Sequence, residues 1–125
     1  MYTKRCEDVP AIRADDEINI GTYYQIIPRD MTRNKNFNIT IEKYDRKGRV
    51  FAHDHGKDAP YPNGEQCFFI LKGKARVRLA DEEKVLHERE IVYVPMGVEH
   101  EVWPEADEVE ILTLSVWSDE RKDDR

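Results

Sequence analysis

The chain has 125 residues, of which 39% are hydrophobic and 37% are charged, and its formal net charge is −6 at pH 7. This length fits one domain with one core. The acidic charge disfavours nucleic acid and anionic membrane surfaces as partners, because both repel a negatively charged protein. No apolar run approaches the length of a spanning helix, and the N-terminal residues lack the apolar core of a signal peptide, so we expect a cytoplasmic location.

Short apolar or alternating segments, separated by turn-forming residues, follow one another along most of the chain. We predict strands, in chain order, over residues 21–28, 37–44, 49–55, 66–71, 75–79, 90–94, 98–103 and 109–117. Residues 56–64 are dense in Gly, Pro, Asn and Asp and are predicted to form a loop. A further turn is predicted at residues 72–74, where a glycine stands between two lysines.

Alternation within these segments predicts which side chains face the interior. Phe37, Ile39 and Ile41 are expected to point inward from the second strand. Arg76 and Arg78 alternate with apolar residues and are expected on a solvated face. The strands 66–71 and 109–117 are apolar on both faces, so we expect another subunit to cover the faces of these strands that would otherwise meet solvent.

No segment has a convincing helical pattern. Many short strands with regular turn signals indicate an all-β sandwich or barrel. The predicted organisation is an N-terminal arm over residues 1–20, a barrel over residues 21–117 and a charged C-terminal tail over residues 118–125.

Three of the four histidines lie in two short motifs, His53-Asp-His55 and Pro95-Met-Gly-Val-Glu-His100. Side chains two residues apart share one face of a strand, so His53 and His55 are expected to point the same way, together with Phe51. Neutral imidazoles that converge in an apolar interior are costly unless a partner satisfies them, and a divalent metal is such a partner.

Both motifs, in this order, resemble those of the cupin superfamily. The first reads Gly48…His53-Asp-His55…Gln66…Gly73, the second contains Pro95-Met-Gly97-Val-Glu-His100, and the resemblance spans roughly residues 48 to 117. It implies a double-stranded β-helix, or jelly roll, whose metal ligands come together inside the barrel. A homodimer, as is common among cupins, is expected.

The sequence departs from the cupin pattern at three places. Arg89 stands where the second motif usually has a glycine, and the loop after His55 is longer than usual. Gln66 stands where a glutamate is usual; Glu65 is adjacent, but a shift of one residue turns it to the opposite face. We therefore take Gln66 as the fourth candidate ligand, which either coordinates directly or hydrogen-bonds a metal-bound water.

The resemblance implies metal ligands His53, His55, Gln66 and His100. Imidazole-rich sites suit iron(II), nickel, copper or zinc, with manganese less favoured without a carboxylate; iron is the metal expected first. Because all four ligands are neutral, the metal's charge is uncompensated, which favours an anionic ligand such as an enolate or carboxylate.

This site leads to a functional hypothesis with two alternatives. The leading hypothesis is a dioxygenase-like enzyme that acts on a small oxygen-bearing, anionic or enolisable substrate. The alternatives are a cupin isomerase or lyase and a non-catalytic metal- or ligand-binding module. Tyr61, in the loop near the site, is the candidate catalytic residue, as an acid–base group or a lid; its place between two prolines favours a packing role instead.

Overall fold

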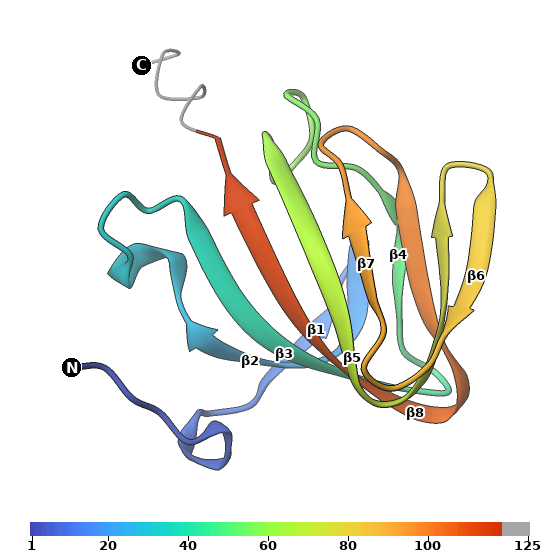
Figure 1. The fold of residues 1–125 in the computed structure, drawn as a ribbon, viewed down its shortest axis with the longest axis horizontal. Helices are drawn as coiled ribbons and strands as arrows, with labels where there is room; N and C mark the ends of the chain where they lie inside the picture. The colour runs from blue at the N-terminus through green and yellow to red at the C-terminus, as the bar shows by residue number, and fades with distance from the viewer. Residues whose placement is uncertain (119–125) are drawn as a thin grey trace.

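The structure is a computed structural model that describes residues 1–118, in which almost every regular element is a β-strand (Figure 1). The elements are η1 (Cys6–Asp8), β1 (Ile12–Asp15), β2 (Asn19–Ile27), η2 (Arg29–Met31), β3 (Phe37–Asp45), β4 (Arg49–His53), β5 (Gly64–Leu79), β6 (Glu82–Leu86), β7 (Ile91–Val94) and β8 (His100–Trp117). The predicted tail lies, except for Ser118, outside the described residues. No helix among residues 1–118 is long and apolar enough to cross a membrane.

The strands form an antiparallel barrel with two walls. One wall has the order β1-β2-β3-β8-β5-β7, and the other is built from β4, β8, β5 and β6. β4 also pairs with β2, through Asn19 opposite Val50 and Ile20 opposite Arg49, which joins the walls along a second line. The predicted all-β jelly-roll barrel is thereby confirmed.

The two longest strands, β5 and β8, run through both walls (Figure 1). Their N- and C-terminal parts correspond to segments that the sequence pattern separated, at residues 66–71 and 75–79 in β5 and at residues 98–103 and 109–117 in β8. The turn predicted at residues 72–74 is therefore wrong. The β5–β8 register shifts there instead, and Gly73 takes a φ of +83°, so the strand bends without ending.

The core lies between the walls and consists mainly of valine, isoleucine and aromatic side chains. Its fully enclosed members include Tyr44, Ile70, Val102 and Ile111. On the outside, Arg49 of β4 and Arg78 of β5 both donate hydrogen bonds to Glu101 of β8. These contacts tie together three strands beside His100, and they hold Arg78 on the outer face, opposite the core residues as predicted, with 22% of its side chain exposed.

The inward face predicted for β3 is wrong. Asn38, Thr40, Glu42 and Tyr44 line the interior cavity, so alternation turns Phe37, Ile39 and Ile41 to the outer face. The physical reason is that this wall encloses a polar cavity, whereas its outer face is apolar. The usual assumption that the apolar side of a strand is the inner one therefore fails here.

The face predicted for Phe51 is also wrong. The β4–β8 register shifts between Val50 and His53, which indicates a β-bulge that changes the alternation of side chains along β4. As a result Val50, and not Phe51, lines the cavity together with His53.

Candidate metal centre

The three histidines of the two motifs come together at one end of the cavity. His53 ends β4, His55 follows two residues later, and His100 begins β8 directly opposite His53 in the antiparallel ladder. His55 is 5% exposed and His100 is fully enclosed. Their ligand atoms all lie within 4.8 Å of one another. The structure thus brings together the three histidines that the sequence predicted.

Each imidazole is oriented by a backbone carbonyl group. The Nδ1 atoms of His53, His55 and His100 lie 2.7, 2.8 and 3.0 Å from the carbonyl oxygens of Phe51, Tyr61 and Val98. A carbonyl oxygen only accepts, so each Nδ1 is the donor and each neutral ring keeps its lone pair on Nε2. Metal-binding histidines in proteins commonly hold this arrangement.

The Nε2 atoms face one another with too few protons to satisfy them. His53 Nε2 and His55 Nε2 are 3.2 Å apart, and His100 Nε2 is buried without any hydrogen-bond partner. Protonation does not resolve this, because burial lowers the pKa of His55 and lowers that of His100 to about 4. A divalent cation accepts all three lone pairs, so these residues are able to hold a metal ion.

Gln66 and Glu65 point to opposite faces of β5. Gln66 lines the cavity, where its Nε2 donates to Ser115 Oγ at 2.9 Å and its Oε1 is buried without a hydrogen-bond partner. The Glu65 carboxylate instead accepts a hydrogen bond from the exposed Tyr93 hydroxyl. Gln66 and His55 line the same cavity. The role of Gln66 as a ligand or as a hydrogen-bonding group stays a prediction.

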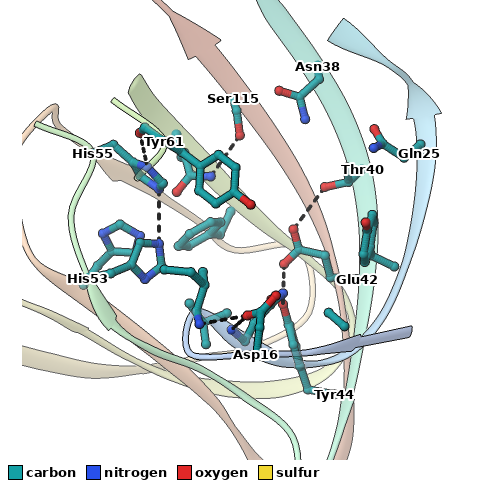
Figure 2. A pocket seen from close by; sticks show the side chains of 18 of the residues that line it. Asp16, Gln25, Asn38, Thr40, Glu42, Tyr44, His53, His55, Tyr61 and Ser115 are labelled. Atoms are coloured by element: carbon teal, nitrogen blue, oxygen red, sulfur yellow. Dashed lines mark hydrogen bonds between the residues drawn. The ribbon is translucent and has the colours of Figure 1, made fainter. Parts of the chain in front are cut away.

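Tyr61 contributes its backbone and its ring to the site in different ways. Its carbonyl oxygen orients His55, while the residue is 55% exposed and lines the cavity (Figure 2). The predicted acid–base or lid role of the phenol remains a prediction.

The cavity in front of the histidines is about 380 Å³, within the size range of small-molecule sites. Strands β2, β3 and β8 and the segment around β1 supply its remaining polar lining, as Figure 2 shows. These residues are Arg13, Asp15, Asp16, Asn19, Tyr23, Gln25, Asn38, Thr40, Glu42, Tyr44 and Ser115. Both hydrogen-bond donors and hydrogen-bond acceptors therefore line the cavity.

Glu42 is the carboxyl group of this lining with the most enclosed surroundings. Tyr44 donates its hydroxyl to Glu42 Oε1 at 2.8 Å, and Thr40 donates to Oε2 at 3.0 Å. Burial raises the pKa of Glu42, and the hydrogen bonds from Tyr44 and Thr40 oppose only part of that rise. Gly21 makes room for the Tyr44 ring, because a Cβ atom at this position would lie 2.5 Å from it.

The sequence analysis did not find Glu42, since it placed the opposite face of β3 inward. The sequence did contain a signal, because hydrogen-bonding residues occupy every second position of this strand, at Asn38, Thr40, Glu42 and Tyr44. They alternate with the apolar residues Phe37, Ile39 and Ile41, so the strand has one polar and one largely apolar face. Neither the resemblance nor the alternation alone decides which of the two sets faces the cavity.

Comparison with known proteins agrees with this geometry. The sequence model of the family described as "Cupin domain" matches residues 52–117, which include all three histidines and Gln66. No curated protein matches the chain in sequence.

Solved structures with similar folds cover nearly the whole chain. A predicted oxalate decarboxylase from Thermotoga maritima has a TM-score of 0.80 at 13% identity, covering 94% of this chain and 100% of its own. An RmlC-like cupin from Shewanella frigidimarina has a TM-score of 0.72 at 12% identity, with 98% and 96% covered. KdgF from a Halomonas species has a TM-score of 0.68 at 13% identity, with 93% and 94% covered. At these identities the likeness shows the fold alone.

Proposed function

The chain belongs to the cupin family, and from that premise we propose that it is a metal-dependent enzyme acting on a small oxygen-bearing substrate that is anionic or enolisable. One observation carries the proposal: three imidazoles, two of them buried and each fixed by a carbonyl at Nδ1, direct their Nε2 lone pairs toward one another at the end of a polar cavity. The cavity volume suits a small substrate.

His53, His55 and His100 would hold the metal, with Gln66 either completing the ligand set or orienting a ligand by its free Oε1. When bound, a divalent metal supplies Lewis acidity and, where it is iron(II), oxygen chemistry. Because the three imidazoles are neutral, the site favours an oxygen ligand that carries negative charge. The fold relative described as a predicted oxalate decarboxylase is named for such a substrate, a small oxygen-bearing anion.

Within this class, the reaction proposed first is dioxygenase-like, with iron(II) as the metal. Isomerase or lyase chemistry with a redox-inert metal is the second candidate, and Glu42 favours it, because proton transfer by a carboxyl group in the cavity requires no oxidant.

The experiment combines metal analysis with turnover. Protein purified without an affinity tag is expected to contain about one divalent metal ion per chain by mass spectrometry, and the iron-loaded form is expected to consume oxygen with a member of a panel of β-diketones, phenols and α-keto acids. Isomerisation or cleavage supported by zinc, without oxygen uptake, would select the second candidate. Thermal stabilisation by these compounds without any turnover would instead make the protein a binding module, and absence of metal would overturn the proposal.

A further inference from the structure

The cavity holds an ionisable side chain, that of Glu42, which is not one of the candidate metal ligands. Glu42 projects from the middle of β3, where its backbone lies between Tyr23 of β2 and Ile111 of β8. It lines the same cavity as His53, His55 and His100, yet it is not among the groups that lie within ligand distance of one another. Figure 2 shows Glu42 across the cavity from His53.

A purely structural role does not explain why this residue is a glutamate. The carboxyl oxygens accept hydrogen bonds from the hydroxyls of Tyr44 and Thr40, and a glutamine is able to keep both contacts, because its amide oxygen accepts from one hydroxyl and its NH2 group donates to the other. A glutamine avoids the cost of enclosing an ionisable group, and the cavity already uses glutamine at positions 25 and 66. The carboxyl group therefore provides something that an amide cannot, which is a site that gains and loses a proton in the ordinary pH range.

The surroundings of Glu42 suit a proton donor and acceptor. Its enclosure raises its pKa, and a higher pKa makes the carboxylate a stronger base. Tyr44 and Thr40 fix both carboxyl oxygens, and Asn19 donates to the Tyr44 hydroxyl at 3.3 Å, so the group has a defined orientation.

We propose that Glu42 is the catalytic acid–base residue of this cavity and that it enolises a small ketone or keto acid lying between it and the histidine triad. The ionised carboxylate takes the proton from the carbon next to the carbonyl group. The C–H bond breaks, an O–H bond forms on Glu42, and the electron pair moves through the new C=C bond onto the carbonyl oxygen, giving an enolate. Return of the proton to the same carbon restores the carbonyl compound and the ionised Glu42, with no net oxidation.

This inference rests on the proposed function, because the metal centre would stabilise the enolate charge. The metal centre and the role of Glu42 are tested by separate measurements. Zinc and pyruvate binding are measured by calorimetry, and exchange of the pyruvate and dihydroxyacetone carbon-bound protons in D2O is followed by proton NMR with zinc-loaded protein.

We expect zinc-loaded wild-type protein to accelerate exchange with at least one of the two probes. Glu42→Gln is expected to lower that rate by about 100-fold or more, the range typical of a lost acid–base group, while binding of zinc and pyruvate stays within about two-fold. Glu65→Gln, which removes a carboxyl group from the outer face of the neighbouring strand β5, is the matched control and is expected to exchange at the wild-type rate.

Each other outcome has a distinct meaning. Failure of the wild type to bind zinc counts against the proposed function. Zinc binding without exchange of either probe, or full exchange by Glu42→Gln, overturns the role of Glu42 and leaves the metal centre standing. If Glu42→Gln does not fold, Glu42→Asp replaces it: this variant keeps the acid but withdraws it by one methylene group, and an unchanged exchange rate would overturn the proposal equally.

Discussion

At the scale of single residues, the metal centre is organised by how the histidines are held. Each of the three rings donates its Nδ1–H to a main-chain carbonyl, and two of those carbonyls, at Phe51 and Val98, lie two residues before the histidine they orient. The local chain itself therefore sets the tautomer. This removes much of the ordering cost that flexible ligands incur when they bind a metal.

His100 is the candidate ligand that a substitution tests best, because it is fully enclosed and its Nε2 has no protein partner. We expect His100→Ala to weaken metal affinity by at least about 100-fold, since loss of a ligand exceeds the 10- to 100-fold effect of losing its outer hydrogen-bond partner. Metal content after dialysis measures this, with Glu65→Gln as the control that retains metal. Full metal content in His100→Ala would show that the assignment of His100 is wrong.

Glu42 makes stability depend on pH in a direction that follows from its raised pKa. Below its ordinary value of 4.5, the carboxyl group is protonated in both the folded and unfolded chain. Above 4.5 the unfolded chain ionises first, so stability is lost as the pH rises from 4.5 through the raised pKa of the folded state. Glu42→Gln removes this loss.

The measurement is the melting temperature of metal-free wild type and Glu42→Gln across pH 4 to 8. We expect the variant to gain stability relative to the wild type as the pH rises. Tyr44 and His53 bear on the Glu42 carboxyl group and are present in both proteins, so the comparison reports the Glu42 charge together with its coupling to these two groups. A difference that stays constant with pH would contradict the raised pKa.

Sequence reasoning located the histidines but not the opposite side of the cavity, for a physical reason. His53, His55 and His100 belong to short motifs whose spacing alone identifies them. Glu42 belongs to a strand with two plausible inner faces, and only the barrel's closure decides that its polar face encloses the cavity. Side-chain alternation shows which residues share a face of the strand, but the tertiary structure decides which of the two faces points inward.

At the scale of the elements, β5 and β8 matter most, because each runs through both walls and β8 carries His100 and Ser115. The sequence pattern predicted the pieces of these strands correctly and separated them where charged residues and a glycine interrupt the apolar run. A strand that bends from one wall to the other contains such an interruption at the bend, and it continues beyond it. Composition alone does not distinguish a bend from a turn.

Gly73 is the residue that permits the bend in β5. Its φ of +83° disfavours any residue with a side chain, and a Cβ atom there would lie 2.4 Å from the carbonyl oxygen of Glu108. Gly97 has nearly the same φ, +82°, but no atom lies within 4 Å of its Cβ position. A residue with a side chain would therefore be strained at either position, but only at position 73 would it also clash with a neighbouring atom.

We expect Gly97→Ala to lower the free energy of unfolding by about 1–2 kcal/mol, from backbone strain alone. Gly73→Ala is expected to cost about 3 kcal/mol or more, because the carbonyl of β8 must also move. Urea unfolding of the metal-free variants measures both values. Equal losses would show that the Glu108 carbonyl group does not constrain Gly73.

At the scale of the whole molecule, the wall that encloses the polar cavity is apolar on its outer side. Its outward-facing residues form a continuous apolar surface across β3, β8, β5 and β7, which we call the outer apolar face. This face comprises Phe37, Ile39, Ile41, Leu112, Leu114, Val116, Cys67, Phe69, Ile91 and Tyr93. Its exposed members include Ile91 at 60%, Tyr93 at 52% and Val116 at 39%. An exposed apolar surface of this kind in an otherwise highly charged chain indicates an interface.

A second copy of the chain is the occupant that we propose for the outer apolar face, because a two-fold axis lets the same surface cover itself. We expect sedimentation to show a dimer, and Ile91→Glu to shift it toward monomer by placing a charge within the buried interface. Ile91 is exposed in the single chain, so the substitution leaves the barrel core intact. Met96→Glu introduces the same charge at an exposed residue of the loop before β8, and it is expected to remain dimeric. A monomeric wild type, or a dimer insensitive to Ile91→Glu, would assign this face another role.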